Sequence, residues 1–351
     1  MIRLTWGALT AREPQMPTNA TPYTVERARL GEQEIVVLTG PGASRRLRVA
    51  RHGAALLSFE VALDGSMHDL ADGYCDAAEV ASRPGSRFAI MVPFAGRIAD
   101  ARYHFDGQLQ DLQPGVVGTA RASRHGFVRD TEFEITALEA DEHGARVTLG
   151  TSSIRPQLGY PHAIDLTVTF TLDAGGITLE VRMRNVGDSA APCFFGWHPY
   201  FRLADSTVDG WQLQIPAQTL IRTDADLIAL PGVAAFAALD EVPALDFRKP
   251  RLLGDSILDH EYTNLDADPD GRIRTHLRDP SSELGIAVWQ EHGVMHAFTA
   301  DTISRDARRA IALEPMECMA DAFNRPECAD AIRLQPGAER SFRCGVEVEL
   351  P

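Results

Sequence analysis

The sequence predicts an all-β protein, a large antiparallel β-sandwich with few, short helices. Apolar and polar side chains alternate with a period of two over most of the 351 residues, as they do in strands with one buried face. Helical spacing is scarce, and the 21 prolines and 28 glycines are spread along the whole chain. With 44% hydrophobic residues, the chain has enough apolar side chains to fill a sizeable core.

The first strand signals are two short runs that each lead into an Asp-Gly turn. Residues 59–63 alternate and run into the dipeptide at 64–65, and residues 103–105 run into the dipeptide at 106–107. A strand followed by such a dipeptide is typical of antiparallel pairing.

The middle of the chain contains the clearest hairpin. Residues 166–172 and 177–184 alternate without interruption, and the turn between them, at 173–176, is Asp-Ala-Gly-Gly. Alternation on both sides of a short glycine turn predicts a β-hairpin with one buried face. Residues 146–149 and 344–350 add further strands.

Residues 227–239 have spacing that allows a short helix, but a Pro-Gly dipeptide interrupts them. No linker, charge run or fixed-period repeat marks a domain boundary. We therefore expect a single domain over residues 21–351. Residues 1–20 are expected to be a disordered extension, whose first part precedes a second methionine, Met16, and need not belong to the native protein.

The composition argues against several classes of partner. The net charge of −15 and the pI near 5.2 disfavour nucleic acid and anionic membrane surfaces. No apolar run approaches the roughly 20 residues of a membrane span. The five cysteines are odd in number and contain no C-x-x-C pair, which favours reduced thiols in a cytoplasmic protein over disulfides or a zinc site.

Two short motifs carry the most informative ionisable side chains. Glu314 lies in Ala-Leu-Glu-Pro-Met at 312–316, and His198 lies in Gly-Trp-His-Pro-Tyr-Phe at 196–201. In both, a proline breaks an apolar run, which predicts that a strand ends there and that its last side chains face a cleft. One group can accept a proton while the other donates one, so the pair suits general acid–base catalysis.

The neighbours of each candidate leave a structural alternative open. Trp197 and Tyr200 beside His198 are either plain core or an apolar platform for the C–H face of a sugar, where desolvation would move the histidine pKa. Glu314 follows a run that should be buried, where a carboxylate is costly unless it is paired or used. Glu317 and Asp321 are close in sequence, and repulsion among these carboxylates is a candidate cause of a raised pKa.

Three further residues are candidates for binding a polar ligand. Arg97 lies between apolar neighbours, His125 precedes a glycine that lets the backbone approach a ligand, and Asp259 is a candidate acceptor for hydroxyl groups. The plain alternatives are a solvated arginine, a structural histidine and a polar loop. His292 and His296 have H-x-x-x-H spacing, but no glutamate follows the first histidine, so a zinc-protease site is not expected.

Taken together and in chain order, these segments resemble the aldose 1-epimerase (mutarotase) family. The resemblance runs from about Leu30 to the C-terminus. The segments that carry it lie at 93–98, 124–127, 159–161, 198–201, 259–260 and 313–315. The family fold is a large antiparallel β-sandwich, a supersandwich, with a sugar cleft on one face, which agrees with the two-residue period.

The resemblance implies a role for each matching residue. Glu314 matches the general base that takes the proton from the anomeric hydroxyl, and His198 matches the general acid that protonates the ring oxygen. Arg97, His125 and Asp259 match residues that hold the sugar hydroxyls. The ring opens to an aldehyde and recloses as the other anomer, so the resemblance implies neither an organic cofactor nor a metal.

Two positions depart from the family pattern. Gly96 stands where the family usually has asparagine, which removes one expected hydrogen bond to the sugar. Arg202 stands where asparagine often follows Tyr-Phe. Together with Arg124 and Arg129 it places positive charge near the cleft, and an acidic sugar becomes an alternative substrate unless these arginines pair with local acids such as Asp130 and Asp205.

The leading hypothesis is a cytoplasmic isomerase, a monomer or homodimer, that interconverts the anomers of a free aldohexose. One alternative is a hexose-6-phosphate 1-epimerase in which the extra arginines bind the phosphate. Another is a carbohydrate-binding protein of the same fold without turnover, against which the presence of both Glu314 and His198 argues. In each case the partner is a small-molecule sugar.

Overall fold

The computed structural model describes residues 22–118, 121 and 123–349. The predicted extension at 1–20 lies outside the described residues. Within them, strands dominate and pair antiparallel throughout, so the prediction of an antiparallel all-β fold is confirmed. The described chain contains no helix long and apolar enough to cross a membrane.

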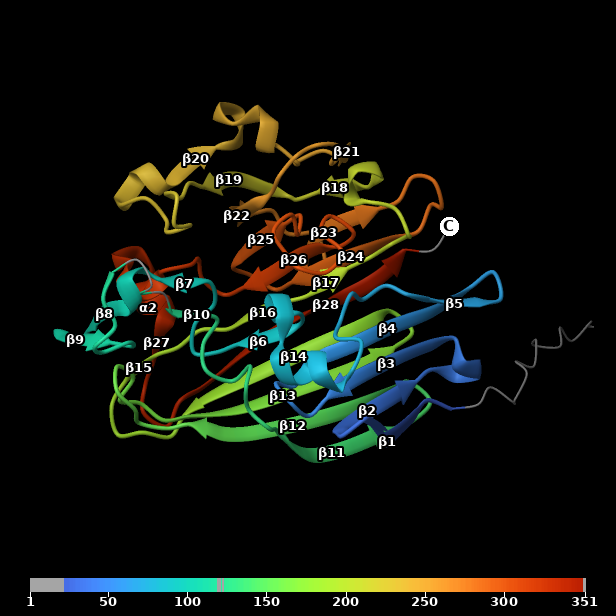
Figure 1. Ribbon diagram of the computed structural model, residues 1–351, viewed down its shortest axis with the longest axis horizontal. Helices are drawn as coiled ribbons and strands as arrows, with labels where there is room; N and C mark the ends of the chain where they lie inside the picture. The colour runs from blue at the N-terminus through green and yellow to red at the C-terminus, as the bar shows by residue number, and fades with distance from the viewer. Residues whose placement is uncertain (1–21, 119–120, 122, 350–351) are drawn as a thin grey trace, which may run out of the picture.

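A nine-stranded sheet extends through the molecule, from β11 near the bottom of Figure 1 to β21 near its top. In spatial order its strands are β11 (Glu134–Ala140), β12 (Gly144–Ile154), β13 (Ile164–Asp173), β14 (Gly176–Asn185), β28 (Glu339–Glu349), β24 (Gly285–Gln290), β23 (Ile273–Arg278), β18 (Gln212–Gln214) and β21 (Arg251–Leu252).

An eight-stranded sheet carries most of the chemistry described below. Its strands run in the order β20 (Phe236–Ala238), β19 (Ala217–Ile221), β22 (Asp259–Leu265), β25 (Val294–Phe298), β26 (Ile311–Met316), β16 (Gly196–His198) and β6 (Ala89–Met91), and β17 (Tyr200–Phe201) also pairs with β26.

The N-terminal part of the described chain forms a five-stranded meander that lies against β11 and β12. Its strands are β1 (Thr24–Leu30), β2 (Gln33–Thr39), β3 (Arg45–Ala50), β4 (Leu56–Leu63) and β5 (Ser66–Asp69). The remaining described pairs are β7 (Arg97–Ile98) with β10 (Ser123–Arg124), β8 (Arg102–Phe105) with β9 (Gln108–Asp111), and β15 (Ala191–Pro192) with β27 (Arg333–Leu334).

Helices are short, as predicted. They are α1 (Ala77–Ser82), α2 (Ala329–Ile332) and several single 3-10 turns. The stretch at 227–239, which allowed a helix by its spacing, contains a 3-10 turn at Gly232–Ala235 and then β20 instead. The Pro-Gly break explains the difference, because Pro231 begins that turn in an extended conformation.

The predicted hairpin is β13 and β14, where Val168 faces Val181 and Phe170 faces Leu179 across the strands. Side chains of β13 alternate strictly between buried and half-buried positions. The buried set joins one continuous apolar cluster that also contains Leu38 of β2 and Leu313 of β26. The period-two pattern therefore builds a core shared by all three large sheets.

Candidate active site

A cleft of about 370 Å³ opens on the eight-stranded sheet. Five ionisable side chains from four strands line it: His198 (β16), Asp259 and Glu261 (β22), His296 (β25) and Glu314 (β26). Segments at 83–86, 96–97, 124–129 and 302–303 also contribute to the wall. The structure thus brings the two predicted acid–base groups into one cavity although 116 positions separate them in the sequence (314 − 198 = 116).

Strand register places three of these groups in a row. Glu261 is the cross-strand partner of His296, and His296 is the cross-strand partner of Glu314. Asp259 lies two residues before Glu261 and so shares its face of β22. Neighbouring antiparallel strands hold directly opposed side chains close together, which explains the dense cluster.

The His198 imidazole and the Glu314 carboxylate face each other, with Nε2 and Oε1 3.5 Å apart. Burial raises the pKa of Glu314 to about 8. Burial, together with the charges of His296 and Arg129, lowers the pKa of His198 to about 3. Because the two pKa values move in these opposed directions, the pair holds a single proton at neutral pH and is not an ion pair at rest.

The predicted cause of the raised Glu314 pKa is wrong. Glu317 lies 3.2 Å from Arg340 and accepts the backbone N–H of Phe195, so its carboxylate has its own partners. Burial is the main cause for Glu314, and the carboxylates that add to it are Asp259 and Glu261 from the neighbouring strand β22. The carboxylates that matter are close in space and distant in sequence.

His296 was not identified as a site residue from the sequence. Its Nε2 lies 3.0 Å from Asp259 Oδ1 and 4.0 Å from Glu314 Oε1, and its Nδ1 lies 3.9 Å from Glu261 Oε1. Burial alone would lower its pKa, but the charges of Glu314 and Asp259 outweigh burial and raise the pKa to about 9. His296 is therefore a cation held among three carboxyl groups.

His125 approaches the site from the loop after β10. Its ring lies 5.3 Å from the His198 ring, edge to face, and Nδ1 contacts Met91 Sδ at 2.8 Å. The backbone turns sharply here, with φ of 62° at His125 and 64° at Gly126. A side chain at Gly126 would meet the Val92 carbonyl oxygen at 2.0 Å, so only glycine allows this close approach.

Arg97 lines the cleft at the start of β7, and its charge lowers the pKa of Asp259, against the effect of burial. The preceding Gly96 has φ of 62°, and a Cβ there would lie 2.6 Å from the Ala320 Cβ. An asparagine at position 96 therefore has no room without movement of Ala320. That contact accompanies the departure from the family pattern, in which glycine replaces asparagine at position 96.

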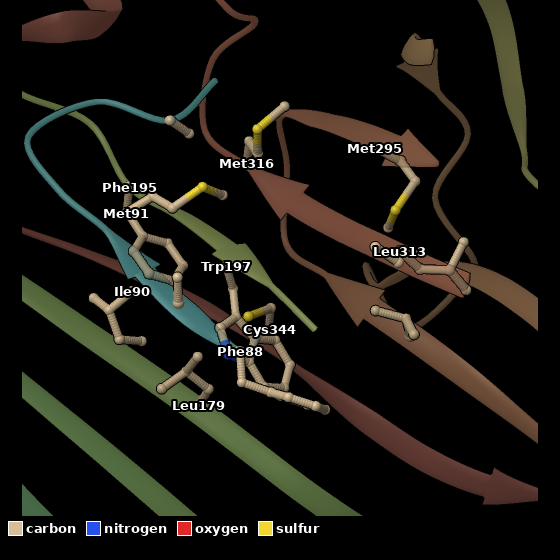
Figure 2. Packing of buried hydrophobic residues seen from close by; sticks show 14 of the residues in the cluster. Phe88, Ile90, Met91, Leu179, Phe195, Trp197, Met295, Leu313, Met316 and Cys344 are labelled. Atoms are coloured by element: carbon tan, nitrogen blue, oxygen red, sulfur yellow. The ribbon is translucent and has the colours of Figure 1, made fainter. Parts of the chain in front are cut away.

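Trp197 does not line the cleft, and its interpretation as a sugar-binding residue is wrong. It is fully buried beside Phe88, with ring centroids 5.7 Å apart, and points into the core (Figure 2). Successive side chains of a strand point to opposite faces, so Trp197 faces the core because His198 faces the cleft. Tyr200 does line the cleft and stacks on His198, with centroids 5.0 Å apart and planes inclined by 10°.

The expectations about the two strand ends and about Arg202 had different outcomes. Pro199 separates β16 from β17, so the strand break after His198 is confirmed. β26 continues through Pro315, so the predicted break after Glu314 is wrong. Arg202 does not reach the cleft, since it pairs with Asp72 and Asp306, each at 3.1 Å.

Across the described residues, no group of three or more His, Cys, Asp and Glu side chains is arranged to hold a metal ion. The chemistry that this cleft supports is proton transfer by His198 and Glu314, with polar side chains around them to bind hydroxyl groups.

Comparisons with known proteins identify one family. The profile of the Aldose 1-epimerase family matches residues 35–347. The aldose 1-epimerase of Escherichia coli K12 is 25% identical over 315 residues, which cover 82% of this chain and 88% of that protein. The uncharacterized protein YihR of the same organism is 28% identical over 249 residues, covering 71% and 74%. The solved structure of galactose 1-epimerase from Lactobacillus acidophilus superposes with a TM-score of 0.77 at 17% identity, covering 94% and 99% of the two chains.

Proposed function

The chain belongs to the aldose 1-epimerase family and is an isomerase, and from that premise we propose that it interconverts the α and β anomers of a free aldohexose. The observation that carries this proposal is the facing pair of Glu314 and His198, 3.5 Å apart in one cleft. Anomerisation requires a proton to leave one sugar oxygen and another to arrive at the neighbouring oxygen. Two fixed groups perform these transfers together without moving.

In the proposed mechanism, the Glu314 carboxylate removes the proton from the anomeric hydroxyl. His198, protonated, gives its proton to the ring oxygen, and the bond between C1 and that oxygen breaks. The product is the open-chain aldehyde, whose C1–C2 bond rotates. Reclosure reverses both transfers and gives the other anomer. The proton count of the pair is one in every step, because ring opening only moves the proton from His198 to Glu314.

The protonation state of the resting pair suits the ring-closing half of this cycle. A raised pKa at Glu314 and a lowered pKa at His198 place the shared proton on Glu314. That is the arrangement needed for ring closure, in which Glu314 protonates the carbonyl oxygen. In ring opening the sugar must bind to the tautomer with the proton on His198. Both forms carry the same net charge, so exchange between them changes no charge on the protein.

The surrounding residues have proposed binding roles. Asp259, kept ionised by His296, accepts hydrogen bonds from hydroxyl groups, and Arg97 and His125 supply donors. Tyr200 donates its hydroxyl to the Gly85 carbonyl at 3.1 Å, which fixes the ring against which His198 stacks. We infer that Tyr200 orients the acid. A cytoplasmic location and the choice between monomer and homodimer stay predictions.

Polarimetry of freshly dissolved α-D-glucose and α-D-galactose tests the proposal. The purified protein should accelerate relaxation of the optical rotation well beyond the buffer rate. If the protein binds these sugars but leaves their anomerisation at the buffer rate, it is a carbohydrate-binding protein without turnover. Two-dimensional exchange NMR of the anomeric protons gives the same answer for sugars whose rotations differ little.

A further inference from the structure

Three arginines line the cleft from the segments at 83–86 and 124–129. Arg83 comes from the end of α1, and Arg124 and Arg129 come from β10 and the turn after it. None of the strands that carry the acid–base pair contributes them. Anomerisation of a neutral sugar needs no such group of cations, because both reacting oxygens are served by Glu314 and His198.

The three arginines differ in how their charge is balanced. Arg83 pairs with Asp130 at 2.7 Å. Arg124 and Arg129 form no ion pair within 4.0 Å with any carboxylate of residues 22–118, 121 and 123–349. Of the two local acids that the sequence offered for neutralising these charges, Asp130 is thus taken by Arg83 and Asp205 lies beside Arg309. Of these three arginines, Arg124 and Arg129 therefore remain without an acidic partner.

Arg129 is the better placed of the two. It is partly buried, donates from Nη1 to Ser86 Oγ at 2.7 Å and from Nη2 to the Arg124 carbonyl at 3.2 Å. Its Nε is buried and has no hydrogen-bond partner among the described residues. Burial and the nearby charge of Arg124 lower the pKa of Arg129, because both disfavour the charged form of its guanidinium. A partly buried cation of this kind is costly unless an anion joins it.

The position of Arg129 indicates which part of the sugar it would meet. It lines the same cleft as His198, the group assigned to the ring oxygen. The carbon next to that oxygen, C5, carries the exocyclic carbon C6. The ring hydroxyls are assigned above to Asp259, Arg97 and His125, so a substituent at C6 is the part of the sugar left for Arg129.

We propose that the substrate is an aldose with an anionic group at C6, phosphate or carboxylate, and that Arg124 and Arg129 bind that group. This rests on the reaction proposed above, anomerisation by Glu314 and His198, and replaces the uncharged aldohexose with a charged one as the preferred substrate. The planar guanidinium presents paired N–H donors that match two oxygens of such a group. The bound anion would neutralise both arginines.

The test compares three sugars that share one ring and differ at C6: D-glucose, D-glucose 6-phosphate and D-glucuronate. Exchange NMR gives kcat/KM for each above its buffer rate. We expect at least one charged sugar to exceed glucose by about tenfold or more, with the phosphate and carboxylate arms showing which anion fits. Raising NaCl from about 50 to about 500 mM should reduce this preference.

Substitutions then assign the preference to residues. Arg129→Gln and Arg124→Gln should each lower kcat/KM for the charged sugar by about tenfold more than for glucose. Arg129→Lys, which keeps the charge without the paired donors, should restore part of the loss. Arg146→Gln, an exposed arginine on β12 that pairs with Glu139, is the matched control and should change neither value. Circular dichroism and melting curves confirm that each variant is folded.

The outcomes separate this inference from the proposed function. If glucose is turned over as well as or better than both charged sugars, the anionic substrate class is wrong and the epimerase proposal stands. If the arginine variants lose activity equally on glucose and the charged sugars, the arginines only support the loops and the inference is overturned. If no aldose is accelerated above the buffer rate, the proposed function itself fails.

Discussion

The imidazole of His296 is hydrogen-bonded to the carboxylate of Asp259, with Nε2 and Oδ1 3.0 Å apart. The same ring stands 4.0 Å from Glu314 Oε1, so one imidazolium influences both a proposed binding carboxylate and the proposed base. Its charge keeps the pKa of Asp259 low against burial, and it partly offsets the burial that raises the pKa of Glu314. The charge of His296 thus favours the ionised form of Asp259 and limits the rise in the pKa of Glu314.

His296→Gln should keep a hydrogen bond to Asp259 and remove the positive charge. The pKa of Glu314 then rises further, because the charge that lowered it is gone. We expect the alkaline limb of the kcat/KM profile to move up by about one pH unit or more, and kcat/KM at neutral pH to fall by about tenfold. His276→Gln, on β23 and paired with Glu349, is the control and should leave the profile in place. An unchanged alkaline limb in the His296 variant would show that its charge does not reach the base.

The pH dependence of the native protein follows from the shared proton. Between the His198 pKa of about 3 and the Glu314 pKa of about 8 the pair holds one proton, and above about 8 it holds none. Without that proton nothing can be delivered to the ring oxygen. We expect kcat/KM to stay level around neutrality and to fall as the pH rises above about 8, measured by exchange NMR with the buffer rate subtracted at each pH. A rate that climbs steadily through pH 9 would show that the deprotonated pair is the active form.

Removing the proposed base should remove most of the rate. Glu314→Gln keeps the shape of the side chain and its neutral hydrogen bonding but cannot accept a proton, so kcat should fall by about 10²–10⁴-fold. Exposed Glu291, paired with Arg343, provides the control as Glu291→Gln. Sugar binding by the Glu314 variant, followed by intrinsic fluorescence or NMR line broadening, should persist. A near-native rate in this variant would place the base elsewhere.

The sequence was informative where the structure depends on local pattern. Period-two alternation predicted β13 and β14 because each strand has one buried face, and the motifs around Glu314 and His198 predicted that both groups face a cleft. The same alternation already implied that Trp197 and His198 point to opposite faces, so the error at Trp197 came from reading a motif without its strand geometry.

Other features depend on contacts between distant segments. His296 became a site residue through its register with Glu314, and no local pattern around His296 shows which strand pairs with its own. Arg202 was expected near the cleft, but its partner Asp72 lies 130 residues earlier in the chain. Strand register and long-range ion pairs arise from the packing of the whole core, which a single sequence does not display.

Asp72 should be essential for stability. This buried carboxylate holds three arginines, with Arg87 at 3.1 Å, Arg202 at 3.1 Å and Arg305 at 3.0 Å. Asp72→Ala leaves Arg87 buried without its carboxylate, which costs about 3–5 kcal/mol of unfolding free energy. Urea denaturation measures the loss, and exposed Asp205→Ala should change the midpoint little. A midpoint close to native for the Asp72 variant would mean that water or a neighbouring group replaces the carboxylate.

Gly126 should combine a conformational and a steric requirement, and two substitutions separate them. Gly126→Ala forces a side chain into a left-handed backbone, with φ of 64°, and into the Val92 carbonyl oxygen at 2.0 Å. Gly107→Ala meets the first problem, with φ of 76°, but has nothing within 4 Å of its Cβ. The Gly107 variant should therefore lose about 1–2 kcal/mol, the ordinary cost of that conformation, in urea denaturation. The Gly126 variant should lose clearly more and should also lose anomerase activity, because the displaced turn carries His125 away from His198. Equal losses of stability in the two variants, with activity retained, would show that the loop relaxes without moving the histidine.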